Sequence, residues 1–176
     1  MKRFRSAMIL CLSAAAALTA CSAVSDAAVT ISDSKSTVQL LRNVIADTID
    51  DSAIQGVTKN DDAALACGDE PDEDRFFWRS SVLLDIVGAS DSDIEGAATG
   101  AIAALENTGW VSAEADPVAH SVTVELTSEE SLATIRITST DDADGDGRGA
   151  SVFVVVNGPC VKTAGADSAE MKALVP

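Results

Sequence analysis

The sequence predicts an α+β domain in which two helices pack on one face of an antiparallel sheet of about five strands. Two segments place apolar residues at helical spacing, and each begins with a capping-box pattern. Five other segments are predicted strands, most clearly residues 76–87, where apolar and polar residues alternate with the period of two that a half-buried strand requires. The order is helix, strand, helix and then four strands, which favours an antiparallel sheet over the alternating pattern of a parallel one.

The first helix is expected over residues 36–52. Ser36 and Gln39 fit a capping box, in which two side chains satisfy N–H groups of the first turn. An apolar stripe follows at spacings of three and four: Val38, Leu41, Val44, Ile45 and Ile49. The small and polar residues 21–35 have no sustained period and predict a tether. After the helix, the acidic run 59–74 is expected to be a solvated loop.

The clearest strand is expected over residues 76–87, because its apolar residues alternate with polar ones. One face carries Phe76, Trp78, Val82, Leu84 and Ile86. Gly88 ends this strand, and Ser92 and Glu95 form a second capping box. The second helix then carries the stripe Ile94, Ala98, Ala101, Ile102 and Leu105 and ends at Gly109.

The remaining strands form a predicted meander over residues 110–115, 121–126, 132–138 and 151–156. Cys67 lies before the strand 76–87 and Cys160 lies just after the last strand. Antiparallel neighbours would bring those ends together, so we expect the strand 76–87 to pair with the last one. Residues 163–176 are expected to be a flexible tail, so the domain spans residues 36–162.

The charge balance excludes one large class of partner. The 176 residues include 12 Lys and Arg against 28 Asp and Glu, a formal net charge of -16 at pH 7. Nucleic acids are held by clustered Lys and Arg. Aromatic residues make up only 3% of the chain, which disfavours stacking on bases. The sequence therefore predicts no nucleic-acid partner.

Residues 1–20 have the features of a secretory signal peptide. Lys2, Arg3 and Arg5 form a positive n-region, and residues 7–18 form an apolar h-region too short to span a bilayer. Removing residues 1–20 takes away three basic and no acidic residues. The remaining chain has 9 basic against 28 acidic residues, a formal charge of -19.

The residues Leu18, Thr19, Ala20 and Cys21 resemble the lipobox of bacterial lipoproteins. The resemblance implies that Cys21 becomes the first mature residue and carries a diacylglyceryl group. Two or three acyl chains, at about 0.8 kcal/mol per buried methylene, anchor a protein stably to a bilayer. We therefore expect a domain on the extracytoplasmic face of the cell membrane, attached to the lipid bilayer through the Cys21 anchor.

Cysteine usage supports the same compartment. Cys11 lies in the signal peptide and Cys21 is the lipidation site, which leaves Cys67 and Cys160. In an oxidising space, two remaining cysteines are most simply one disulfide. Metal ligation by this pair is disfavoured because His120 is the only histidine.

The pattern as a whole is similar to the small lipoproteins common in actinobacteria. Beyond the lipobox, the matching residues are Cys67, Trp78, Gly109, Trp110, Pro159 and Cys160. The likeness spans nearly the whole chain. That group brings no agreed biochemical activity, so the resemblance implies a location and not a reaction.

One acidic loop has the spacing of a calcium site. Asp142, Asp144 and Asp146 fall at positions 1, 3 and 5 of a loop of EF-hand type, with Gly147 at position 6. Position 12 is Phe153 instead of a bidentate Glu, and strands flank the loop. A Gly-rich acidic turn is the default interpretation and weak calcium binding is the alternative. No other cofactor is expected.

Two classes of function remain open. The favoured one is a non-catalytic binding or accessory module of the cell envelope, whose partner is an envelope protein or a small ligand. The alternative is an extracytoplasmic hydrolase or calcium-dependent enzyme of unrecognised type, although no Gly-x-Ser-x-Gly motif accompanies His120. A deep pocket with converging carboxylates would favour the enzyme, whereas a shallow surface with an apolar patch would favour the binding module.

Overall fold

The structure, a computed structural model, describes residues 29–49, 54–68, 74–86, 91–114, 121–141 and 150–174. The helices are α1 (Ile31–Thr48), α2 (Asp91–Glu106) and α3 (Ala169–Leu174). The strands are β1 (Ile54–Ala66), β2 (Arg75–Ile86), β3 (Val111–Glu114), β4 (Ser121–Thr127), β5 (Thr134–Thr140), β6 (Ser151–Asn157) and β7 (Val161–Lys162). The predicted α+β class is confirmed.

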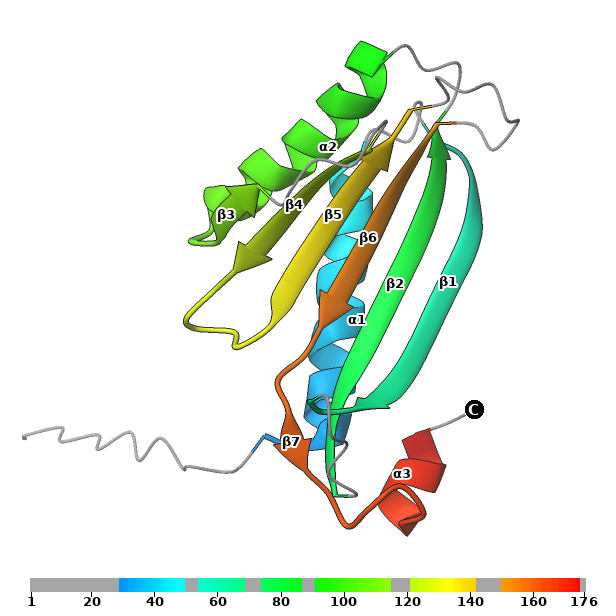
Figure 1. Ribbon diagram of the computed structural model, residues 1–176, viewed down its shortest axis with the longest axis vertical. Helices are drawn as coiled ribbons and strands as arrows, with labels where there is room; N and C mark the ends of the chain where they lie inside the picture. Colours follow the sequence, from blue (N-terminus) through cyan, green and yellow to red (C-terminus); the bar gives the residue numbers. More distant parts are fainter. Residues whose placement is uncertain are drawn as a thin grey trace, which may run out of the picture.

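The strands form one antiparallel sheet with the order β1-β2-β6-β5-β4-β3, and β7 pairs with the beginning of β2 (Figure 1). The expected pairing of the strand 76–87 with the last predicted strand is confirmed, because β2 lies beside β6 with Ser81 opposite Val155. The connection through α2 carries the chain from β2 to the far edge at β3. From there the meander returns strand by strand to β6.

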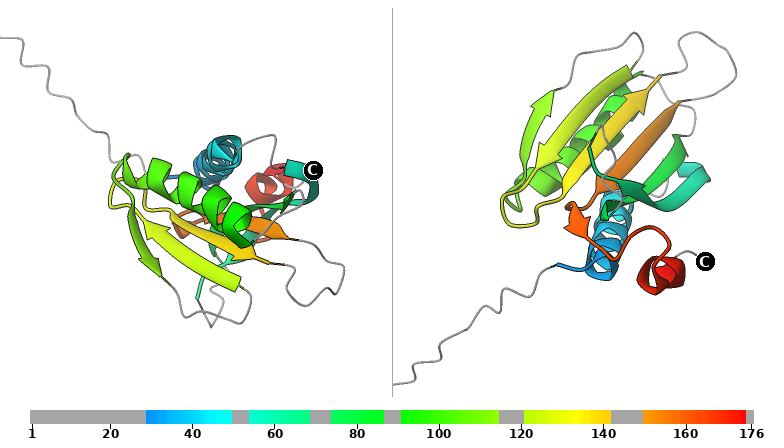
Figure 2. Two further views of the ribbon diagram at one scale, coloured as in Figure 1. Left: turned by 90° about the horizontal axis from the view of Figure 1, so that it is seen from above. Right: turned by 60° about the horizontal axis from the view of Figure 1, so that its bottom comes forward.

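Helices α1 and α2 cover the same face of the sheet (Figure 2). Helix α1 packs on β2 and β6, whereas α2 packs mainly on β5 and β6. Between the layers lies a core of fully buried side chains, the largest of which are Trp78, Ile31, Ile45, Ile49, Leu84, Leu126, Ile135, Ile137, Val38, Val152, Val154 and Val156. The five positions of β2 predicted to share one face, Phe76, Trp78, Val82, Leu84 and Ile86, are all buried, and alternate residues of β5 and β6 are buried as well.

Helix α1 begins at Ile31, earlier than the predicted start at Ser36. Thr30 is the N-cap: its Oγ1 accepts from the Asp33 backbone N–H at 3.1 Å, and the Asp33 carboxylate accepts from the Thr30 backbone N–H at 3.1 Å. This is a capping box with Asp in the place of Glu or Gln. The last part of the expected tether 21–35 is therefore helical, and Ile31 is completely buried.

The expectation of a loop over 59–74 is wrong for its first half, which belongs to β1. Strand β1 is an edge strand that pairs only with β2, and most of its residues are exposed. Exposure on both faces removes the apolar alternation by which a strand is recognised. Charged residues on an edge strand also discourage pairing with other chains. With β1 and β7 added, the sheet has 7 strands instead of about five.

Close contact between α1 and the end of β6 requires glycine at position 158. A Cβ built on Gly158 would lie 2.1 Å from Ser34 Oγ and 3.1 Å from Val38 Cγ1. The Gly158 backbone N–H also donates to the Trp78 carbonyl at 2.9 Å. This contact fixes how closely α1 approaches the sheet.

The expectation of a flexible C-terminal tail over 163–176 is wrong for the residues that the structure describes. Helix α3 buries Met171, and Lys35 Nζ on α1 donates to the Leu174 carbonyl at 2.7 Å. The same Lys35 Nζ lies 4.7 Å from the centre of the Trp78 ring. One buried apolar side chain in six residues is too weak a periodic signal to predict a helix, so only packing reveals it.

Candidate functional site

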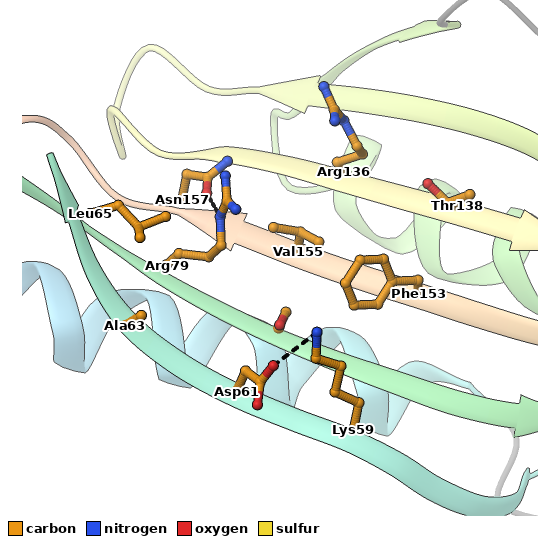
Figure 3. A pocket seen from close by; sticks show the side chains of 11 residues that line it. Lys59, Asp61, Ala63, Leu65, Arg79, Arg136, Thr138, Phe153, Val155 and Asn157 are labelled. Atoms are coloured by element: carbon orange, nitrogen blue, oxygen red, sulfur yellow. Dashed lines mark hydrogen bonds and ion pairs between the residues drawn. The ribbon is translucent and has the colours of Figure 1, made fainter. Parts of the chain in front are cut away.

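The face of the sheet opposite α1 and α2 holds a groove of about 480 Å³ (Figure 3). Strands β1 and β5 form its two sides, with β2 and β6 between them. The groove is lined by Lys59, Asp61, Ala63, Leu65, Arg79, Ser81, Arg136, Thr138, Phe153, Val155 and Asn157. Binding sites for small molecules typically measure about 300–1,000 Å³, so the groove falls in that range.

Strand β6 supplies the apolar floor of the groove. Phe153 and Val155 point toward the groove and are half-buried, whereas the alternate side chains of β6 fill the core. Ser81 on β2 lies opposite Val155 and is only 4% exposed. A strand that is apolar on both faces is usually covered on both faces. In the described structure the helices cover one face of β6, and the other face is the floor of the groove.

Basic side chains surround this floor. Arg79 on β2 donates through Nε to Asn157 Oδ1 at 2.9 Å, and its guanidinium lies 5.8 Å from the centre of the Phe77 ring. Arg136 on β5 pairs with Glu125. Lys59 Nζ lies 3.0 Å from Asp61 Oδ2, an ion pair that Figure 3 shows at the β1 side of the groove. Because Asn157 is neutral, this hydrogen bond does not offset the positive charge of Arg79.

A polar network holds β1 against α1 on the opposite side of that strand. Arg42 on α1 has a side chain that is 9% exposed, and its Nη1 lies 3.3 Å from Asp62 Oδ2. The same Nη1 also donates to Asn60 Oδ1. Trp78 Nε1 donates to the other oxygen of Asp62 at 3.3 Å. In an antiparallel strand alternate residues point to opposite faces, so Asp62 faces α1 while Asp61 and Ala63 line the groove.

The ionised form of Asp62 is favoured in this setting. Burial alone would raise the pKa of the Asp62 carboxyl. Hydrogen bonds from neighbouring side chains, that of Trp78 among them, and the positive charge of Arg42 outweigh this effect and lower the pKa of Asp62 below its ordinary value. The network therefore holds a charged pair at neutral pH.

Of the residues singled out in the sequence, the two cysteines Cys67 and Cys160 are joined. Their sulfur atoms are 2.02 Å apart, and the bond ties the end of β1 to the segment between β6 and β7. Cys21, His120 and the candidate calcium ligands Asp142, Asp144 and Asp146 lie outside the described residues. Within the described ranges, no group of three His, Cys, Asp or Glu side chains could hold a metal ion.

A second hollow of about 520 Å³ lies where α2 ends and β3 and β4 meet. It is lined by Thr108, Gly109, Val111, Thr127, Ser128, Glu129 and Glu130. Turn residues make up much of this surface, and it includes two acidic and no basic side chains. The groove on the open face combines an apolar floor with fixed charged groups, so it is the better candidate for a binding site.

Sequence reasoning missed Arg42, although a signal was present. Position 42 lies four residues after Val38 and three before Ile45, on the buried side of α1. A charged residue at such a position needs a buried partner. Val44, which was expected in the apolar stripe, is 48% exposed instead. The groove was missed because its β1 side was expected to be a loop, and because the register that places Arg79 and Arg136 on either side of Val155 could not be read from the sequence.

The comparisons with known proteins give one structural likeness. No protein-family model and no curated protein sequence matches the chain. The fold is similar to a solved structure described as "the putative lipoprotein LppA from Mycobacterium tuberculosis". The two chains are 15% identical, the match covers 74% of this chain and 78% of that chain, and the TM-score is 0.45. At this level the likeness does not extend to a ligand or an activity.

The helices that the structure describes are all too short or too polar to cross a membrane.

Proposed function

We propose that the chain is a lipid-anchored protein on the extracytoplasmic face of a bacterial cell membrane and that it works as a non-catalytic binding module. The anchor is Cys21, supported by its place after Leu18, Thr19 and Ala20 and by the signal-peptide features before it. The ligand site is the groove on the open face of the sheet. The groove carries the proposal because its apolar floor is built from a central strand and its polar groups are fixed by neighbours.

The anchor also limits where the domain can lie. The chain from Cys21 to the helix cap at Thr30 can span at most about 30 Å, at about 3.3–3.6 Å per residue. A domain on so short a connection stays close to the bilayer. Its groove would therefore meet ligands that occur at or near the membrane surface.

The anchor is tested by replacing cysteines one at a time. Cys21→Ser should abolish incorporation of a labelled fatty acid and shift the protein out of the washed membrane fraction. Cys11→Ser makes the same chemical change within the signal peptide and should leave both properties unchanged. Labelling that persists in Cys21→Ser, or is lost equally in both variants, contradicts the lipid anchor.

The binding site is tested on protein recovered from its native cells. Intact-mass measurement under native conditions should show a bound ligand, and Phe153→Asp should lose it because a negative charge then stands on the groove floor. Leu40→Asp is the control, since Leu40 is a 64% exposed side chain on α1, on the other side of the sheet. Absence of any bound mass, or its retention in Phe153→Asp, contradicts a ligand site in the groove.

A further inference from the structure

We infer that the groove binds small amphiphiles, in which an anionic carboxylate or phosphate group is held by Arg79 and Arg136 and an apolar body lies on Phe153 and Val155. This inference rests on the proposed function, because it names the ligand class of the same groove. Four features of the groove favour this ligand class: its positive charge, the orientation of its arginines, the register of the sheet and the apolar floor.

The groove has a charge opposite to that of the chain. The chain has a formal net charge of -16, yet the lining side chains include three basic residues and one acidic residue. The structure describes eight basic residues in all, so three of the eight gather here. Glu125, which pairs with Arg136 beside the groove, offsets one further charge. A local positive field in an acidic protein favours an anionic ligand.

Arg79 is oriented for an anion. Its Nε is occupied by Asn157 Oδ1, and the Phe77 ring lies beside its guanidinium. Among the described residues, neither Nη1 nor Nη2 of Arg79 has a hydrogen-bond partner. Two terminal N–H groups of a planar guanidinium match the two oxygens of a carboxylate or phosphate. The arginine is therefore held from one side and open on the side that binds anions.

The sheet register places the second arginine across the floor from the first. Val155 on β6 lies opposite Arg136 on one side and opposite Ser81 on the other, and Ser81 is two residues from Arg79. Arg136 uses Nε and Nη2 to bind Glu125, which leaves Nη1 for a ligand. Figure 3 shows Val155 between Arg79 and Arg136, so an anionic group above Val155 would lie between the two arginines.

The apolar part of the ligand follows from the rest of the floor. Phe153 continues the floor from Val155 along β6, whereas Ala63 on β1 lies opposite Arg79, toward the other end of the groove. A fully polar anion such as inorganic phosphate would leave this apolar surface in water. A neutral apolar molecule would leave Arg79 without an anion. An amphiphile satisfies both parts of the groove.

The test measures binding of four probes to the full chain as recovered from the expressing cells, in phosphatidylcholine nanodiscs if it is membrane-bound and in buffer if it is not. The probes are naphthoate, naphthyl phosphate, uncharged naphthamide and inorganic phosphate, and empty nanodiscs correct for partition into lipid. Naphthoate and naphthyl phosphate should bind at least about tenfold more tightly than naphthamide, because charge-assisted hydrogen bonds are lost in the amide. Inorganic phosphate should displace naphthoate poorly, because it has no apolar part to lie on the floor of the groove.

Matched variants assign the effect to the groove. Arg79→Gln and Arg136→Gln should each weaken naphthoate binding, Arg79→Gln by about tenfold because its terminal nitrogens lack other partners. Arg75→Gln makes the same change at an exposed position of β2 outside the groove and should have no effect. Phe153→Ala should weaken the binding of naphthoate and of naphthyl phosphate, and thermal unfolding of each variant shows that it is folded.

Several results would overturn the inference. One is equal binding of naphthoate and naphthamide, with both lost in Phe153→Ala; this outcome removes the anionic class but leaves the groove as the site of the proposed function. Another is an equal loss of naphthoate binding in Arg75→Gln and Arg79→Gln, which would indicate that any positive charge on the protein attracts the probe. Binding of none of the probes, or of inorganic phosphate as tightly as naphthyl phosphate, also overturns it.

Discussion

Arg42 on α1 and Asp62 on β1 form an ion pair of 3.3 Å between Nη1 and Oδ2, which links the first helix to an edge strand. Most residues of β1 are exposed, and among the described strands it pairs only with β2. The pair therefore holds one wall of the groove in place from behind. Its two members differ in burial: the Arg42 side chain is 9% exposed and that of Asp62 is 26% exposed.

This difference predicts unequal costs for removing the two charges. Asp62→Ala leaves a buried guanidinium without its carboxylate and should lower the free energy of unfolding by about 2–3 kcal/mol. Arg42→Met replaces the cation with an apolar side chain of similar length and leaves a carboxylate that water reaches, so the cost should be about 1 kcal/mol. Urea unfolding of both variants measures the two values. A larger loss in Arg42→Met would contradict this account of the pair.

The low pKa of Asp62 predicts how stability depends on pH. An unfolded Asp has a pKa of about 3.9, and the folded-state pKa of Asp62 lies lower, so the folded protein binds fewer protons in this range. The stabilisation is present above about pH 4 and is lost as the pH falls through the folded-state pKa. The difference in unfolding free energy between wild type and Asp62→Asn should therefore shrink between about pH 5 and pH 2.

The control for this titration is Asp61→Asn, at the neighbouring residue whose side chain is 58% exposed on the groove side. Asp61→Asn should change the pH dependence of stability less than Asp62→Asn does, because the ion pair that Asp61 makes with Lys59 is exposed to solvent. Asp33 also has a lowered pKa, from its hydrogen bonds with Thr30, but it is unchanged in both variants. If the difference in unfolding free energy between wild type and Asp62→Asn stays constant between about pH 5 and pH 2, ionised Asp62 does not stabilise the fold.

The contact of Gly158 with Ser34 predicts a compensated pair of substitutions. Gly158→Ala forces a Cβ to within 2.1 Å of Ser34 Oγ and should cost about 1–3 kcal/mol. Ser34→Ala alone should cost little, because its buried hydroxyl has no hydrogen-bond partner among the described residues. In the Ser34→Ala background the Gly158→Ala change should cost less, which a double-mutant cycle by thermal or urea unfolding measures. If the stability costs of the two substitutions are strictly additive, a contact other than that between Gly158 and Ser34 sets the distance between α1 and the sheet.

The packing of α3 predicts that the C-terminal segment contributes to stability. Met171 is 6% exposed, so Met171→Ala should lower the free energy of unfolding by about 2 kcal/mol and speed proteolysis near the C-terminus. Glu170→Ala changes an exposed neighbour on the same helix and is the matched control. If both variants unfold and digest like wild type, α3 does not pack on the domain in solution.

The strands of the core were predictable because their inward residues alternate. Phe76, Trp78 and Val82 on β2 show that period in the sequence and are buried in the structure. Strand β1 escaped prediction because an exposed edge strand has no apolar face to reveal it. Helix α3 escaped because one buried Met in a short segment has no period. The early start of α1 depends on an Asp in the capping box, which the Ser/Thr-to-Glu/Gln pattern does not include.

By itself, the sequence determined the properties that depend on local spacing: the α+β class, the apolar stripes and the pairing of two remaining cysteines, together with the expectation of a lipid-anchored location. Tertiary structure alone decided the candidate site. Arg79 and Arg136 are far apart in the chain, and they flank one floor because β6 inserts between β2 and β5. The same insertion leaves the apolar outer face of β6 beneath fixed positive charges. Such a juxtaposition depends on the register between strands that are distant in the chain, which no local pattern of residues encodes.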